Sequence, residues 1–337
     1  MPGKLIVDEI EDSGGTSVIG RKNFIINGNF DIWQRGTSVT GQTSDQYLAD
    51  RWYFVDSGAT YSYQQGSFTV GQTDVPNNPK YFANLTITGA DDSARLEQRI
   101  EDVYTFAGET VTLSFYAKYT SNAPTDFDVQ ILQYFGSGGS TSVLTTAATG
   151  QTLTTSWQKF TYTISVPSIS GKTVGSGSYL TIRPVINTNN ETFDYQLAQV
   201  QVEKGSVATN FEVRPIAEEL ELCQRYYAKS YNQATAPGTA STTTGCLNYI
   251  THAGSSNGDR STIFFPQTMR TTPTVTLYST ATGTSGKIRI ENTGTDIDGT
   301  AYYIGESTSN YYLNGTQTTG YNAILQYQAD AELWLVQ

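Results

Sequence analysis

Short runs of alternating hydrophobic and polar residues fill the first two thirds of the chain, and turns that contain Gly, Pro and Asn break up the runs. In the run TVTLSFYAK, Leu113 and Phe115 fall on one side of the backbone, whereas Ser114 and Tyr116 fall on the other. Such a period of two is typical of a strand with one buried and one exposed face. Because no helical period separates the runs, the pattern predicts an antiparallel two-sheet jelly-roll sandwich over residues 23–213.

The hydrophobic period changes once, close to Pro215. Before the proline, Leu197, Val200 and Val202 fit the last strand of the sandwich. After it, one apolar face recurs at helical spacing and consists of Ile216, Leu220, Cys223 and Tyr227. A proline suits a helix start, and the acidic residues that come first complement the helix dipole. We therefore expect a linker helix within 214–232, which either packs on its own sandwich or meets its copies around a symmetry axis.

A second β-rich region follows a Thr/Ser/Ala/Gly/Pro-rich stretch at 233–245. Its short alternating runs predict a smaller β-sandwich, so that 233–337 forms a C-terminal β domain. The opening segment 1–22 contains KLIVDEIED and is too short to fold alone, but it can add a strand to a partner protein. The fold class that we expect is therefore all-β, with one helix between two sandwiches.

Tyrosines crowd the strands of the predicted C-terminal domain. Tyrosine offers a large rigid ring with a polar end, and amides nearby can bond to sugar hydroxyls. The candidate glycan-binding residues are Tyr302, Tyr303, Asn310, Tyr311, Tyr312 and Asn314. Adjacent tyrosines in a strand point to opposite faces, so part of this set is expected to fill a core or a trimer axis instead.

Composition and charge exclude several partners. The chain has 337 residues and a net charge of −11, and no run rich in Lys and Arg offers a phosphate-binding surface. We therefore expect no nucleic acid partner. No apolar stretch approaches the roughly 20 residues that a membrane helix needs, so no membrane insertion is expected. The hydrophobic content of 37% and the 23 tyrosines suit exposed β-sheet better than disorder.

Groups for catalysis are scarce in this sequence. His252 is the single histidine, and Cys223 and Cys246 lie in different segments without a metal-binding spacing. No nucleophile elbow or phosphate-binding loop occurs, and we expect no cofactor and no metal. A glycan hydrolase needs two carboxylates across a sugar, for which Asp91–Asp92 and Asp296/Asp298 are candidates. Because neighbouring acids in a turn usually face solvent, we expect no enzymatic activity.

Several segments resemble tail-fibre and related appendage proteins of bacteriophages and prophages. They include NFIINGNFDIWQRG, LADRW, LAQVQVEKGSVATNFEVRPIAEELELCQRYY and QADAEL, and the resemblance spans residues 23–337. Its most specific part is the EKG…FE.RP…EL.LCQRYY segment. The resemblance implies a homotrimer that attaches to the virion by its N-terminal segment and meets the host surface with distal β domains.

The first domain also resembles jelly-roll carbohydrate-binding modules, through Asn27–Asp31 at its start and Ala107–Lys118 in its middle. Such modules carry an acidic pair in the closing strand that helps to hold calcium. Here Ala198 and Gln199 occupy those positions, so the resemblance does not imply calcium at this site.

Together these patterns predict a structural virion appendage subunit, such as a tail fibre, that binds a host surface polysaccharide without cleaving it. Its expected partners are its own copies, another virion protein and that polysaccharide. Two alternatives stay open. One is a head fibre or connector without a receptor role, and the other is a glycan-degrading tailspike enzyme.

Overall fold

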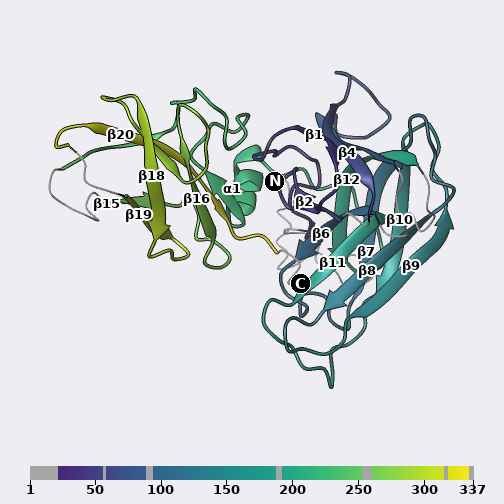
Figure 1. The fold of residues 1–337 in the computed structure, drawn as a ribbon. Helices are drawn as coiled ribbons and strands as arrows, with labels where there is room; N and C mark the ends of the chain where they lie inside the picture. The colour runs from purple at the N-terminus through teal and green to yellow at the C-terminus, as the bar shows by residue number, and fades with distance from the viewer. Residues whose placement is uncertain are drawn as a thin grey trace, which may run out of the picture.

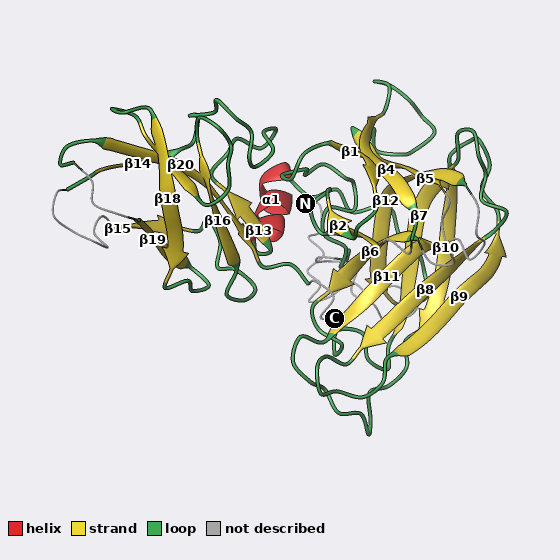
Figure 2. Ribbon diagram, viewed as in Figure 1, coloured by secondary structure: helices red, strands yellow, loops and turns green. Residues whose placement is uncertain are grey.

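The computed structural model describes residues 22–55, 58–88, 94–186, 192–252, 260–314 and 318–333. These residues form two β-rich bodies, with the single described helix between them (Figure 1). Almost everything outside the helix is strand or connecting loop (Figure 2). The all-β class is thus confirmed. The predicted docking segment 1–22 lies outside the described residues except for its last residue.

The larger body consists of two antiparallel six-stranded sheets that face each other (Figure 1). The first sheet contains, in spatial order, β1 (Ser38–Gln42), β4 (Thr60–Ser67), β5 (Tyr81–Thr88), β12 (Phe193–Lys204), β7 (Thr110–Lys118) and β10 (Gln158–Ser165). The second contains β2 (Gln46–Tyr47), β3 (Trp52–Val55), β6 (Arg95–Ile100), β11 (Tyr179–Ile186), β8 (Phe127–Tyr134) and β9 (Val143–Gln151). Neighbours in each sheet are often distant in sequence, as in a jelly roll.

The alternation of strand residues places the core between the two sheets. Leu113 and Phe115 of β7 are fully buried in this core, as their spacing predicts, together with Val200 and Val202 of β12. Tyr116 takes the outer face and is only partly buried. The period-two pattern therefore identifies the face that packs in the core, but it does not predict that Thr112 and Ser114 on the outer face of β7 are buried as well.

Strand β12 contains a β-bulge beside β7. Ala198 pairs with Tyr116 and Gln201 pairs with Ser114, so β12 has one residue more than β7 between the two pairs. The extra residue, Gln199, adopts a φ of +47°. A bulge of this kind reverses the alternation. It thereby keeps Leu197 and Val200 in one core although they are three residues apart.

Helix α1 (Ile216–Gln224) begins where we expected but ends before Tyr227. Tyr227 belongs instead to β13 (Tyr227–Lys229), which pairs with the last strand, β20 (Asn322–Asp330). The prediction of a helical face that includes Tyr227 was wrong, because long-range hydrogen bonds override the local period. The backbone N–H of Ala331 donates to the carbonyl of Tyr226 at 2.8 Å and draws the chain into the sheet.

The remaining predicted helix residues differ in burial. Cys223 is fully buried within its own chain, Leu220 is partly buried, and Ile216 is 59% exposed. Acidic Glu218 and Glu219 occupy the first turn, as the sequence suggests, but no basic residue occupies the last turn. The helix thus packs mainly on its own chain, and Ile216 is its large apolar residue that is exposed.

The smaller body has eight strands around a separate core. Its sheet follows the order β13, β20, β17 (Lys287–Ile290), β18 (Thr295–Tyr302), β19 (Thr308–Leu313) and β15 (Arg260–Phe264), while β14 (Leu247–Ile250) and β16 (Thr274–Ser279) also pair with β20. Ala228 of β13 belongs to this core, so the expected linker range 214–232 contains both the helix and a strand of the smaller body. No helix in the described part of the chain is long and apolar enough to cross a membrane.

Candidate functional site

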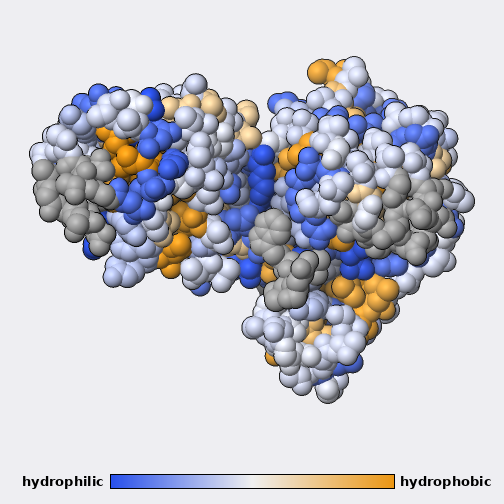
Figure 3. Space-filling view, viewed as in Figure 1, coloured by the Kyte–Doolittle hydropathy of each residue, from blue (hydrophilic) through white to orange (hydrophobic). Residues whose placement is uncertain are grey.

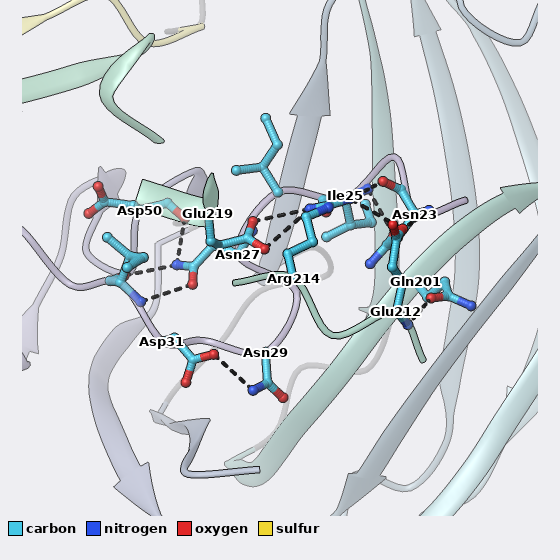
Figure 4. A network of polar contacts seen from close by, with 12 residues as sticks. Asn23, Ile25, Asn27, Asn29, Asp31, Asp50, Gln201, Glu212, Arg214 and Glu219 are labelled. Carbon is cyan, nitrogen blue, oxygen red and sulfur yellow. Dashed lines mark hydrogen bonds and ion pairs between the residues drawn. The ribbon is translucent and has the colours of Figure 1, made fainter. Parts of the chain in front are cut away.

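The NGNFD motif forms a tight turn at the N-terminal edge of the larger body (Figure 4). The Asn27 side chain donates to the carbonyls of Ile32 and Asp50 at 2.8 and 3.0 Å, and its Oδ1 accepts the Ile32 N–H at 3.0 Å. Trp52 Nε1 donates to the Asn27 carbonyl at 2.9 Å. Every polar atom of this side chain is therefore used in holding the turn, so Asn27 is a structural residue.

The EKG…FE.RP…EL segment closes on the same turn (Figure 4). Glu212 accepts the Asn23 N–H at 2.7 Å, and Glu219 of α1 accepts the Asn27 N–H. Arg214 lies 3.1 Å from Glu219 and also donates to the carbonyl of Ile25 at 2.9 Å. The most specific part of the family resemblance thus fixes the helix to the first turn of the sandwich.

A second buried cluster joins the two bodies through the LADRW and QADAEL motifs. Glu332 accepts from Arg51 and lies 3.4 Å from Arg35, which also reaches Asp330 at 3.3 Å. The Arg51 and Glu332 side chains are both almost fully buried. Burial raises the pKa of Glu332, and the two arginines oppose that rise. The charged groups of Arg35, Arg51, Asp330 and Glu332 therefore pair with one another across the contact between the two bodies.

The two tyrosines of the LCQRYY motif complete this junction. The guanidinium carbon of Arg51 lies 3.4 Å from the centre of the Tyr226 ring, and that of Arg35 lies 3.6 Å from the Tyr227 ring. Stacking of this kind is favourable for a desolvated guanidinium. Tyr227, which we expected on an oligomerisation helix, thus contributes to contact between the two bodies of one chain.

The candidate glycan-binding residues lie mainly on β18 and β19, and the structure divides them. Tyr311 is 1% exposed and packs in the core of the smaller body, so it is unavailable to a ligand. Tyr312 lies on the opposite, outer face of β19. On that face Tyr302 pairs with Asn310, and Tyr312 pairs with Thr300. Tyr311 and Tyr312 alternate between core and surface as predicted, but Tyr302 and Tyr303 do not, because neither is buried and their ring centres lie 4.7 Å apart.

The candidate residues other than Tyr311 form one group at the surface, which we call the tyrosine face: Tyr302, Tyr303, Asn310, Tyr312 and Asn314. The Tyr302 ring centre lies 4.7 Å from that of Tyr303 and 5.2 Å from that of Tyr312. Tyr303 is 80% exposed. The Asn310 amide donates to Thr262 of β15 at 3.0 Å, and the Asn314 amide donates to Thr300 at 3.4 Å. Rings and amides therefore lie side by side on the surface.

Strand β15 adds residues to this face that sequence reasoning missed. Its pairing with β19 sets Arg260 opposite Tyr312 and Phe264 opposite Thr308. Phe264 is 75% exposed, and the Arg260 guanidinium carbon lies 5.6 Å from the Tyr302 ring centre. The alternation in RSTIF shows that these residues share a face with Thr262, but only the strand pairing shows which face. Figure 3 shows hydrophobic residues at the surface of the smaller body.

Two of the four acids considered for hydrolysis form ion pairs, and the other two lie outside the described residues. Asp296 lies 3.3 Å from Arg289 and accepts from Thr282 at 2.6 Å, while Asp298 lies 2.6 Å from Lys287. Each is thus held in the β17–β18 ladder rather than set across an open cleft. Asp91 and Asp92 lie outside the described residues. Within the described ranges, no group of three or more His, Cys, Asp or Glu residues is placed to hold a metal ion.

A groove of about 540 Å³ lies where α1 meets the larger body. Asp31 and Trp33 line one side, and Ile216 and Leu220 of the helix line the other. Burial raises the pKa of Asp31, while a hydrogen bond from Asn29 and the charge of Lys80 oppose the rise. The exposed end of the predicted oligomer helix therefore faces a groove that includes the last residue of the NGNFD motif.

No protein-family model matches the chain, and no curated protein matches it. Among solved structures, it is similar to the CBM22-1 xylan-binding domain from Paenibacillus barcinonensis Xyn10C, with 14% identity and a TM-score of 0.34 over 52% of this chain and 99% of that one. It is also similar to the enzymatically active domain of bacteriophage CBA120 tailspike protein 4, with 14% identity and a TM-score of 0.30 over 54% of this chain and 21% of that one. Scores this low carry no functional conclusion.

Proposed function

We propose that this protein is a non-enzymatic, glycan-binding subunit of a bacteriophage appendage such as a tail fibre. The observation that carries the proposal is the tyrosine face, where Tyr302, Tyr303 and Tyr312 lie in contact and beside two side-chain amides. Aromatic rings cover the apolar C–H face of a sugar, while amides bond to its hydroxyl groups. The face therefore matches the chemistry of a polysaccharide chain lying on a sheet.

The attachment role rests on the resemblance to phage tail-fibre proteins described above. In such an arrangement, the N-terminal segment holds another virion protein and the C-terminal body meets the host surface. The buried junction supports this role, because ion pairs and stacked rings hold the two bodies together. A trimer presents three tyrosine faces at once, and the resulting effective concentration offsets the weakness of one shallow site.

The experiment measures how strongly the purified chain and its variants adsorb to the cell-surface polysaccharide of the host. The double variant Tyr302→Ala/Tyr312→Ala removes two rings that are only partly buried, and we expect adsorption to fall at least about tenfold, which corresponds to about 1.4 kcal/mol. Tyr104→Ala is the matched control, because Tyr104 is 60% exposed on the other body. It should adsorb like the unmodified chain.

Two other outcomes identify the alternatives. Unmodified chain that does not adsorb, although it is present on the virion, indicates a head fibre or connector. Release of reducing ends from the polysaccharide indicates a tailspike enzyme and contradicts the non-enzymatic proposal.

A further inference from the structure

A small pocket opens on the outer face of the larger body, far along the chain from the tyrosine face. Its floor consists of Ser114 and Tyr116 of β7, Lys159 of β10 and Gln199 of β12. Pro76, Asn77, Asn210 and Phe211 form its walls. We call it the bulge pocket, because the β12 bulge brings Gln199 to this face.

Both walls of the bulge pocket are held in place. On one side, Gln199 Nε2 donates to the Pro76 carbonyl at 2.7 Å, and the neighbouring Val75 is 1% exposed. On the other, Gln201 Oε1 accepts the Glu212 N–H at 2.8 Å, and Glu203 accepts the Thr209 N–H at 2.8 Å. These contacts fix the segment that carries Asn210 and Phe211. The pocket is therefore preformed, which lowers the entropic cost of binding a ligand.

Gln199 is the residue that points to a ligand. It is 2% exposed, and its Oε1 has no hydrogen-bond partner among the described residues. A buried acceptor without a partner is costly and uncommon in folded proteins. Its φ of +47° is also unusual for a residue with a long side chain. A donor from a bound molecule, such as a hydroxyl group, would satisfy this oxygen.

The size and lining of the bulge pocket limit what that molecule can be. Its volume is about 130 Å³, and an apolar cavity of about 150 Å³ accepts one benzene ring. Because the pocket is slightly smaller than that cavity and a sugar ring is larger than benzene, the pocket can take up one edge of a six-membered ring and leaves the rest of the ring outside it. Tyr116 and Phe211 offer apolar surface for such a ring, while Ser114 and Asn210 offer polar groups for hydroxyls.

Lys159 adds a charge preference. It is the cation among the residues that line the pocket, it is exposed, and it makes no ion pair among the described residues. On a chain with a net charge of −11, such a lysine provides local attraction for an anionic group. We propose that the bulge pocket binds a single sugar unit that carries a carboxylate, as a uronic acid does, and that it is a second carbohydrate site of this chain.

This inference takes its ligand class from the proposed function but places the site on the other body. The test uses saturation-transfer NMR with the full-length chain and two probes, methyl glucuronide and methyl glucoside. We expect both probes to bind, and the glucuronide to bind several-fold more tightly. Lys159→Gln should remove that preference, whereas Lys172→Gln, at another exposed lysine, should leave it unchanged.

Gln199→Asn tests the floor of the pocket. Asparagine tolerates a positive φ, so the bulge should remain. Its shorter side chain places the amide oxygen farther from the sugar ring of the probe. We expect affinity for both probes to fall at least about tenfold while the melting temperature stays close to that of the unmodified chain. A variant that melts early is replaced by Tyr116→Ala, which removes a ring from the outer face.

Three results would overturn the inference. The first is no saturation transfer to either probe with the unmodified chain. The second is that the Gln199→Asn and Tyr116→Ala variants bind both probes as tightly as the unmodified chain does. The third, equal affinity for glucuronide and glucoside, removes the role of Lys159. The Tyr302→Ala/Tyr312→Ala variant separates this site from the proposed function. It should keep glucuronide binding even where polysaccharide adsorption is lost.

Discussion

Gly28 leaves no room for a side chain, and this explains the second letter of the NGNFD motif. A Cβ placed on Gly28 would lie 2.2 Å from the carbonyl oxygen of Val200. The two backbones approach this closely because the Val200 N–H donates to the Gly28 carbonyl at 2.9 Å. Glycine is the residue that permits such an approach. Glycine at this position of the motif is therefore explained by the contact between the first turn of the larger body and the bulged strand β12.

Gly28→Ala should destabilise the larger body, because backbone atoms cannot move aside as a flexible side chain can. Overpacking of this kind costs about 1–3 kcal/mol or more. Urea denaturation followed by tryptophan fluorescence measures the loss, since Trp52 is fully buried in the larger body. Gly305→Ala is the control, because its nearest neighbour would be 3.8 Å away. Equal stability of the two variants would contradict this explanation.

Strands β6 and β11 bring four charged residues together on the outer side of their sheet. Glu97 lies 2.9 Å from both Arg95 and Arg99, and 3.0 Å from Arg183. Burial alone raises the pKa of Glu97, but the three arginines outweigh it and lower the pKa to about 2. The carboxylate is thus strongly favoured in the folded chain, as expected for a buried acid with several cationic partners.

The Glu97 cluster predicts a loss of stability in acid. Because the folded pKa lies below the unfolded value of 4.5, the contribution is complete above pH 4.5 and is lost as the pH falls toward 2. The contribution that is lost is on the order of a few kcal/mol. Denaturant unfolding between pH 2 and 6 measures it.

Glu97→Gln should be less stable at pH 6 and should lose most of this pH dependence. Glu109→Gln serves as the comparison, because Glu109 forms an exposed ion pair with Lys204. If Glu97→Gln keeps the full slope between pH 4.5 and 2, another carboxylate is responsible.

The junction between the two bodies is polar and buried, and this governs how the molecule responds to mutation. Arg51 and Glu332 come from opposite ends of the chain and are both almost fully buried. Arg99 and Tyr47 of the larger body also donate to the Leu333 carbonyl, the latter at 3.0 Å. Removing one member leaves an uncompensated charge, which costs more than the pair contributes.

Arg51→Met should therefore destabilise the chain by about 3 kcal/mol and uncouple the two bodies. Calorimetry should show one transition for the unmodified chain and two for the variant. Hydrogen exchange in β20 should also increase, because that strand leads into Glu332. Lys287→Met, which breaks an exposed ion pair with Asp298, should change little. A single unshifted transition in Arg51→Met would show that the junction does not couple the bodies.

The assembly of the whole chain stays a prediction. Ile216 is the predicted helix residue left exposed, so a trimer that uses α1 must bury it. Ile216→Glu should then lower the mass measured by sedimentation velocity, whereas Val70→Glu, at a fully exposed loop residue, should not. A trimer that tolerates Ile216→Glu would show that α1 is a hinge and that other surfaces hold the copies together.

The sequence alone determined the class of the fold, the position of the helix start and the core face of most strands, because period and turn residues are local properties. The bulge in β12 was not predicted, although Leu197 and Val200 are three residues apart and both lie in the core. Tertiary structure decided the rest. Pairing with β20 ends the helix before Tyr227. The pairing of β15, β18 and β19 places Tyr311 in the core and Phe264 on the outer face of the sheet. The packing of distant segments brings the residues of the LADRW and QADAEL motifs together between the two bodies. Such outcomes depend on which segments meet, and a local pattern carries no information about that.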